Sequence, residues 1–204
     1  MRLGVLGGTF DPPHHGHLIL AEMARDQLEL ERVLWVPAAD PPHKQGRAIT
    51  PAGHRLAMLQ IALDGNPSFT LSRADVDRPG PHYTVDLMDI LATEYPQAAW
   101  FFLMGGDSLR DLPTWHQPSR LIEQCTLAVL PRPGVTYDLA ELESSFPGIT
   151  TRVTFVDAPQ VYIAASDIVQ RVLAGQSIRY LVPPGVEDYI AAHRLYHSRK
   201  ETRA

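Results

Sequence analysis

The sequence has little that would suit a secreted, membrane-bound or broadly nucleic-acid-binding protein. It contains one cysteine, Cys125, so an intramolecular disulfide and a cysteine-based zinc site are excluded. Its most apolar stretch, "LILAEMA" (18–24), is interrupted by Glu22 and is far shorter than a membrane span, and no signal peptide is visible. The net charge of -5 gives no general attraction to nucleic acid or to an anionic membrane. We therefore expect a cytoplasmic protein with neither a membrane nor a nucleic-acid partner.

What the sequence does contain is an alternation of short apolar runs and helical patterns over 204 residues. This alternation is typical of a parallel sheet covered by helices on both faces. It predicts an α/β fold with a single Rossmann-like, doubly wound parallel sheet and C-terminal helices, in one domain over 1–196 with a frayed tail, 197–204. The expected strands are 2–7, 32–37, 69–76, 99–105, 126–134 and 152–159, and the expected helices are 16–30, 50–65 (with Thr50 as N-cap), 83–96, 166–175 and 185–196.

The segment that joins the first strand to the first helix reads "GGTFDPPHHGHL" (7–18). Gly7 and Gly8 allow a sharp turn and a close approach of another molecule. The unpaired backbone N–H groups at the start of the following helix suit a phosphate. His14 and His17 are three residues apart, so on a first helical turn they share one face and can each donate a hydrogen bond to phosphate oxygens. We expect His15 to point elsewhere.

Other interpretations of this segment compete with a phosphate site. The glycine spacing disfavours a dinucleotide-binding fingerprint. A metal site built on two histidines lacks a Cys, Asp or Glu at convincing ligand spacing nearby, and a purely structural turn rarely carries three histidines in four positions. The metal site and the structural turn stay open as alternatives.

The segment resembles the phosphate-binding His-x-Gly-His signature of the nucleotidyltransferase superfamily. The resemblance extends over nearly the whole chain and narrows to the bacterial nicotinate-nucleotide adenylyltransferase family. It implies a Rossmann-like sheet, a requirement for Mg²⁺, and the reaction of ATP with nicotinate mononucleotide to give deamido-NAD and pyrophosphate in NAD biosynthesis. The further blocks that carry the resemblance are "PPHK" (41–44), "HYTVDL" (82–87), "FFLMGGDSLRDLPTWHQ" (101–117), "LPRPG" (130–134) and "SIRYLVPPGVEDYI" (177–190).

The resemblance implies that His14 and His17 are catalytic and stabilise charge on the ATP phosphates. Asp107 would hold the ribose hydroxyls of ATP; the alternative for Asp107 is an N-cap of the next helix. No dedicated protein metal site is predicted, so Mg²⁺ would arrive with ATP. The implied ATP-binding set is Gly7, Gly8, Thr9, Phe10, His14, His17, Gly105, Asp107, Ser108, Ile163 and Ser166.

For the mononucleotide, the resemblance implies a second set of residues. The helix start at Tyr83 and Thr84 would bind the nicotinate carboxylate through backbone N–H groups and so discriminate acid from amide. Trp115 would stack on the pyridine ring, with a buried core tryptophan as the alternative. A solvated surface lysine is the alternative for Lys44. The implied mononucleotide-binding set is Thr9, Lys44, Tyr83, Thr84, Trp115 and Arg132.

The segment "IAASDIVQR" (163–171) departs from the family pattern. Ser166 keeps a hydroxyl at the expected helix N-cap, but Val169 occupies the position where the family carries an arginine. Arg171 lies two residues further on and so faces nearly the opposite side of the helix. We expect another cation, which is Arg171, Lys44 or Mg²⁺, to compensate.

Three alternatives to this function remain. Two are related small adenylyltransferases that use nicotinamide mononucleotide or phosphopantetheine as acceptor, although "YT" and "LPTWH" argue against phosphopantetheine. The third is a nucleotide-binding module without catalysis, which Val169 suggests and which the intact His14 and His17 count against. The sequence leaves the oligomeric state open, a homo-oligomer included.

Overall fold

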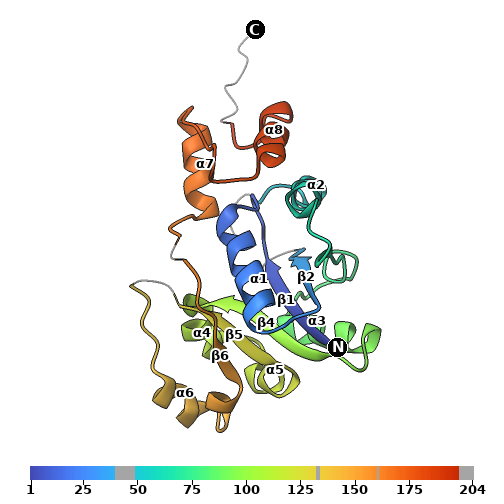
Figure 1. Cartoon of the computed structure of the whole chain (residues 1–204), viewed down its shortest axis with the longest axis vertical. Helices are drawn as coiled ribbons and strands as arrows, with labels where there is room; N and C mark the ends of the chain where they lie inside the picture. Colours follow the sequence, from blue (N-terminus) through green and yellow to red (C-terminus); the bar gives the residue numbers. More distant parts are fainter. Residues whose placement is uncertain (40–48, 132–133, 160, 198–204) are drawn as a thin grey trace.

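The computed structural model describes residues 1–39, 49–131, 134–159 and 161–197, and its centre is a six-stranded sheet (Figure 1). The strand order is β3-β2-β1-β4-β5-β6, and every neighbouring pair is parallel. This is the predicted Rossmann-like, doubly wound parallel sheet. The strands are β1 (Arg2–Gly8), β2 (Arg32–Pro37), β3 (Phe69–Leu71), β4 (Ala99–Gly105), β5 (Thr126–Leu130) and β6 (Val153–Phe155).

The strand order reverses at β1, because β2 pairs on one side of it and β4 on the other. Leu3, Gly4 and Val5 are paired with both neighbours at once. At such a switch point the connections leave in opposite directions and open a crevice outside the carboxyl ends of the strands. The "GGTFDPPHHGHL" segment begins at this point.

Helices cover both faces of the sheet (Figure 1). Side chains alternate between the faces along each strand, so Val5 and Phe102 join a core with α3, α4, α5 and α6. Leu6 and Trp35 join a second core with α1 and α2. The helices are α1 (His15–Gln27), α2 (Ala52–Leu63), α3 (Thr84–Glu94), α4 (Gly106–Asp111), α5 (Pro118–Gln124), α6 (Leu139–Ser145), α7 (Ala165–Leu173) and α8 (Pro184–Ala192), with 3₁₀ turns η2 (Leu112–Thr114) and η3 (Ile149–Thr151).

The predicted C-terminal helices form a third apolar cluster, in which Ile168 and Val172 of α7 and Val186 and Ile190 of α8 pack with Met58 of α2. After α8, the Tyr196 hydroxyl donates a hydrogen bond to Asp11 in the turn after β1, which links the C-terminal region to the start of the chain. Of the expected tail, 198–204 lies outside the described residues. In the described part of the chain, no helix is long and apolar enough to cross a bilayer.

Some predicted boundaries were wrong for local reasons. Thr50 is not the N-cap of α2, because the helix begins at Ala52 after Pro51, and the Thr50 carbonyl accepts a hydrogen bond from Arg55 instead. Three strands are shorter than expected: over the described residues, 69–76, 126–134 and 152–159 are strand only at Phe69–Leu71, Thr126–Leu130 and Val153–Phe155. The helices α5 and α6 were not predicted, and α4 was expected only as the helix that Asp107 would cap; each has only six or seven residues, too few for a clear periodic pattern.

Candidate active site

The turn between β1 and α1 is tightly packed. A Cβ on Gly8 would lie 3.0 Å from the Phe10 ring, which explains why a side chain is absent there. Phe10 has a φ of +49°, a conformation that is uncommon for a bulky residue and that marks a constrained turn. Its ring is buried, with only 2% of the residue exposed, against Trp35 and the edge of His17. The ring contacts of Phe10 with Trp35 and His17 therefore pack the turn against the core.

His14 and His17 lie together at the start of α1. His14 is the N-cap residue, and its ring stacks on that of His17 with centroids 3.6 Å apart. The backbone N–H of His14 donates a hydrogen bond to Nδ1 of His17, at 3.3 Å. Because Nδ1 accepts, the neutral imidazole of His17 carries its proton on Nε2 and is a donor there. A Cβ on Gly16 would lie 3.1 Å from the His14 ring, so glycine at this position makes room for the pair.

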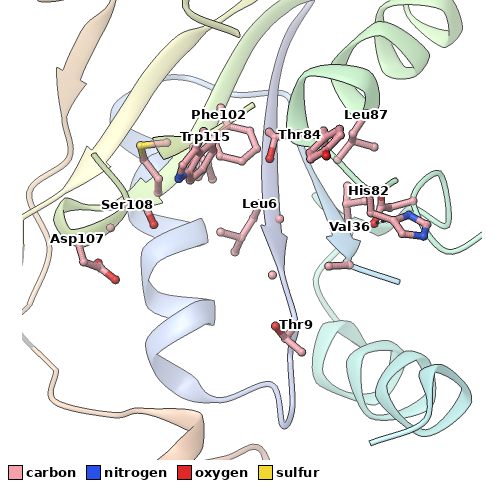
Figure 2. A pocket seen from close by; sticks show the side chains of 18 of the residues that line it. Leu6, Thr9, Val36, His82, Thr84, Leu87, Phe102, Asp107, Ser108 and Trp115 are labelled. Atoms are coloured by element: carbon pink, nitrogen blue, oxygen red, sulfur yellow. Dashed lines mark ion pairs between the residues drawn. The ribbon is translucent and has the colours of Figure 1, made fainter. Parts of the chain in front are cut away.

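A cavity of about 670 Å³ opens above the carboxyl ends of β1, β2 and β4 (Figure 2). Its volume is within the ~300–1,000 Å³ range of small-molecule sites. Figure 2 shows Asp107 and Ser108 on one side of β1, and Leu87 and His82 on the other. The cavity therefore has two halves, one beside α4 and one beside α3.

Ten of the residues predicted to bind the two nucleotides line this cavity, although they come from three separate segments, 7–17, 83–84 and 105–115. They are Gly7, Gly8, Thr9, His17, Tyr83, Thr84, Gly105, Asp107, Ser108 and Trp115. Tyr83 and Thr84 of the mononucleotide set lie beside α3, and Asp107 and Ser108 of the ATP set lie beside α4.

The other predicted residues lie elsewhere. Phe10 and His14 are buried beneath the lining, and neither is part of it. Ile163 and Ser166 do not line the cavity, although the Ile163 carbonyl is 3.6 Å from the position of a Cβ on Gly16. Lys44 and Arg132 fall outside the described residues.

One of the alternative roles is decided by geometry. Gly105 is the N-cap of α4, so Asp107 lies inside the first helical turn and is not an N-cap. Trp115 is only partly buried: its ring packs edge-on against core residue Phe102 at 6.0 Å, and it also lines the cavity, so stacking on the pyridine ring stays a prediction. Its neighbour His116 lines the cavity too and stacks on Tyr83 with centroids 4.0 Å apart.

The expected features of α7 need correction. The helix starts at Ala165 with Ala164 as N-cap, so Ser166 is an exposed residue of the first turn and does not cap the helix. Arg171 lies in the last turn, where its Nε donates to the Ser177 carbonyl at 2.8 Å. Arg171 thus braces the turn after α7 and does not line the cavity, which argues against it as the substitute for an arginine at Val169.

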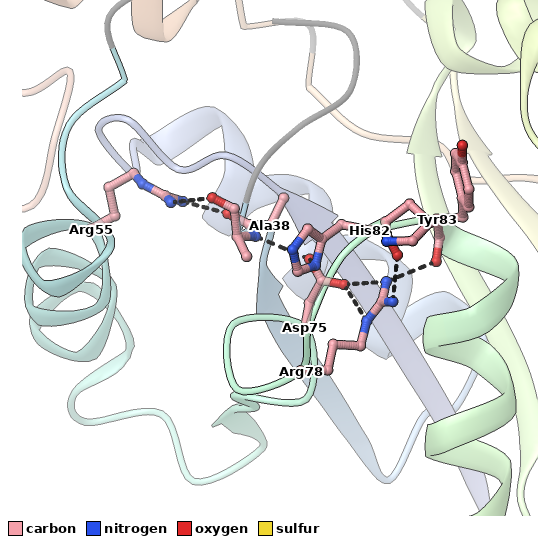
Figure 3. Close-up of polar contacts among 8 residues, drawn as sticks. Ala38, Arg55, Asp75, Arg78, His82 and Tyr83 are labelled. Atoms are coloured by element: carbon pink, nitrogen blue, oxygen red, sulfur yellow. Dashed lines mark hydrogen bonds and ion pairs between the residues drawn. The ribbon is translucent and has the colours of Figure 1, made fainter. Parts of the chain in front are cut away.

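Sequence reasoning missed Arg55, which is 1% exposed and joins three segments beside the cavity (Figure 3). Its guanidinium donates to the carbonyls of Thr9 (2.9 Å), Ala38 (2.8 Å), Ala39 (3.2 Å) and Thr50 (2.9 Å). Burial lowers the pKa of Arg55, and the nearby Asp11 carboxylate partly offsets this effect. The arginine has no sequence signal, because its partners lie in other elements.

The described lining carries little positive charge. It contains the carboxylates of Asp75 and Asp107 and three histidines, and within the described residues it contains no lysine or arginine. Those same residues contain no group of three or more His, Cys, Asp or Glu side chains that could hold a metal ion. A polyphosphate bound here would need further cations.

Comparison with known proteins agrees with the fold. The chain is 56% identical over 197 residues to a protein of Thermomicrobium roseum described as "Probable nicotinate-nucleotide adenylyltransferase", covering 97% of this chain and 92% of the relative. A Synechococcus protein of the same description is 44% identical over 96% of this chain and 94% of its own length. The cytidylyltransferase-like family matches residues 5–171, so the fold and site define a nucleotidyltransferase. Within that class, the chain belongs to the nicotinate-nucleotide adenylyltransferase family.

Solved structures support the same fold. The Plasmodium falciparum nicotinic acid mononucleotide adenylyltransferase complexed with NaAD superposes with a TM-score of 0.79, covering 96% of this chain and 97% of that one. Its sequence identity of 19% makes this a likeness of fold alone.

Proposed function

We propose that this chain joins ATP to nicotinate mononucleotide, forming deamido-NAD and releasing pyrophosphate. The observation that carries the proposal is the two-sided cavity at the sheet's switch point, with His17 and the glycine turn beneath it. ATP fits the half beside α4, where Asp107 and Ser108 lie, and the mononucleotide fits the half beside α3. The two reacting phosphates then meet over the start of α1.

The chemistry requires position more than a protein nucleophile. The phosphate of the mononucleotide attacks the α-phosphorus of ATP in line, and pyrophosphate leaves. The Nε2–H of His17 donates to an oxygen on which negative charge increases in the transition state, at the positively polarised start of α1. The backbone N–H groups of His15 and His17 are already bonded to the carbonyls of Leu181 and His14. His14 holds the His17 ring in that orientation through its backbone N–H and by stacking.

The remaining charge calls for cations beyond the described lining. Mg²⁺ prefers phosphate oxygens and water to an all-protein cage, so it would enter with ATP and offset the triphosphate charge. Lys44 and Arg132 are the expected protein cations on the mononucleotide phosphate. The α3 start at Tyr83 and Thr84 would hold the nicotinate carboxylate through backbone N–H groups.

The test is a pyrophosphate-release assay with ATP and Mg²⁺, run separately with nicotinate mononucleotide, nicotinamide mononucleotide and phosphopantetheine, with each product identified by mass. We expect deamido-NAD to form fastest. Faster turnover of another acceptor would reassign the substrate. ATP binding without product from any acceptor would leave a nucleotide-binding module and overturn the proposal.

A further inference from the structure

The carboxylate of Asp75 connects the two walls of the cavity half beside α3. Asp75 lines the cavity and yet is only 4% exposed. Its Oδ2 accepts a hydrogen bond from the N–H of Ala39, just after β2, at 3.0 Å. Its Oδ1 accepts two hydrogen bonds from Arg78, from Nε at 3.0 Å and from Nη2 at 2.7 Å (Figure 3). One side chain therefore ties the end of β2 to the segment that precedes α3.

Arg78 continues this connection to the start of α3. Its Nη1 donates to the carbonyl of Pro81 at 2.7 Å, and its Nη2 donates to the carbonyl of Tyr83 at 3.2 Å. Tyr83 is the N-cap residue of α3, so its carbonyl also accepts the first helical hydrogen bond, from Leu87. The planar guanidinium thus fixes the backbone at Pro81 and Tyr83, next to the N–H groups at the start of the helix.

We propose that Asp75 and Arg78 act as a positioning pair that sets the preference of this site for an acidic acceptor over its amide. The inference rests on the proposed function, in which the acceptor carboxylate binds the N–H groups at the start of α3. The pair acts through that backbone and does not itself bind the reacting phosphates.

Charge balance is the second part of the argument. A buried carboxylate such as Asp75 would repel an incoming nicotinate carboxylate unless a cation neutralised it. Arg78 supplies that charge from a position with a side-chain exposure of 13%, and His82 lies 3.5 Å from Oδ2 of Asp75 on the same side of the cavity. A neutral amide acceptor experiences no such repulsion. Loss of the arginine charge therefore penalises the acid more than the amide.

The first test replaces Asp75 with asparagine, Asp75→Asn, and measures kcat and KM for ATP and for both pyridine mononucleotides. The single amide oxygen of asparagine cannot accept the hydrogen bonds from both Arg78 and Ala39. The connection between the end of β2 and the segment before α3 is therefore weakened. We expect KM for nicotinate mononucleotide to rise about ten-fold or more, the scale of a lost charged hydrogen bond. KM for ATP should stay within two-fold. Asp75→Asn also removes a negative charge that repels the acid, so the ratio of kcat/KM for acid over amide falls only if the lost positioning of the α3 start outweighs that relief, and we expect this fall.

The matched control is Asp77→Asn, two residues along the same segment. Asp77 pairs with Arg73 on the surface, with side-chain exposures of 54% and 57%, and does not line the cavity. We expect it to leave all three KM values unchanged. The control separates loss of a local carboxylate from loss of this particular link.

A second pair of variants tests the charge. Arg78→Lys keeps the charge without the planar fork, and Arg78→Gln removes it. We expect the lysine variant to retain more of the acid-over-amide preference than the glutamine variant, whatever their melting temperatures. Should either Asp75→Asn or Arg78→Gln fail to fold, Arg78→Lys is compared with wild type alone. A lower acid-over-amide ratio in the lysine variant supports positioning by the planar fork, and an unchanged ratio contradicts it.

Two negative results are distinguishable. A wild-type enzyme that makes no deamido-NAD would overturn the proposed function itself. An active wild type, combined with variants that lose stability or raise every KM equally while keeping the acid-over-amide ratio, would reduce Asp75 and Arg78 to a purely structural ion pair.

Discussion

The hydroxyl of Tyr196 donates a hydrogen bond to Oδ1 of Asp11, so two residues 185 positions apart meet beside the turn that follows β1. Oδ2 of the same carboxylate accepts a hydrogen bond from the N–H of Thr50 at 3.0 Å. The Asp11 side chain thus joins the first turn of the fold to the approach to α2 and to the last described residues. The contact therefore makes the C-terminal region a direct support of the turn that follows β1.

We expect Tyr196→Phe to lower the free energy of unfolding by about 1.5–3 kcal/mol, the range for a hydrogen bond to a charged group. The phenyl ring keeps the packing, so the change isolates the hydroxyl. Urea denaturation followed by circular dichroism measures it. A loss below the error of the extrapolation would show that Asp11 is held well enough by Thr50.

The same contact predicts a pH dependence. Burial, and then the Asp11 charge, raise the pKa of Tyr196 above its ordinary value of 10. Above about pH 10 the unfolded chain therefore loses the tyrosine proton while the folded chain keeps it, so stability is complete below that pH and falls as the pH rises further. The decline should be steeper in the wild type than in Tyr196→Phe, as measured by melting temperature between pH 8 and 11. Parallel curves would contradict this origin.

Arg55→Met should destabilise the fold by about 3–5 kcal/mol, because it removes the buried guanidinium that donates to the carbonyls of Thr9, Ala38 and Thr50. Arg55→Lys should rescue only part of this loss, since one ammonium cannot reproduce the fork. Chemical denaturation of both variants measures the effect. The control is Arg73→Ala, which removes a solvent-exposed arginine and should leave the denaturation midpoint unchanged.

Two histidines of the opening segment, His17 and His15, should differ in their effect on turnover. His17→Ala removes a donor from the cavity lining and should lower kcat by about 10²–10³, the scale of one transition-state donor. His15→Ala is the matched control, because His15 does not line the cavity, and it should keep nearly full turnover. Steady-state assays of variants with unchanged melting temperatures decide the outcome; equal activity of the two would remove His17 from the mechanism.

Cys125 should be chemically inert in the folded protein. Burial raises the pKa of its thiol to about 12, and its Sγ donates to the Leu121 carbonyl. Little thiolate exists at pH 8, so a maleimide or a disulfide reagent should label the native chain slowly and the urea-unfolded chain at once. Rapid labelling of one thiol under native conditions would mean that the β5 region opens far more readily than its packing indicates.

The sheet could be predicted from sequence because its strands are local apolar runs, and β2 and β4 begin and end where the pattern placed them. The glycine turn and the paired histidines could also be found, since they are contiguous. Arg55, Asp75 and Arg78 could not, because their roles depend on partners in other segments, such as Ala39, 36 residues before Asp75. A charged side chain in a helix or loop is ordinarily solvated, so only the folded structure distinguishes these three.

The parallel sheet has a practical consequence for handling the protein. The carboxyl ends of β1, β2 and β4 border the cavity and the strands are parallel, so the amino ends lie at the opposite edge, where the chain starts (Figure 1). Met1 is about half exposed there, and its amino group lies 3.6 Å from Glu31. An affinity tag, a fluorophore or a sensor-surface linkage at residue 1 therefore projects away from the cavity. The same attachment close behind Tyr196 would pull on Asp11 and on the turn that it supports.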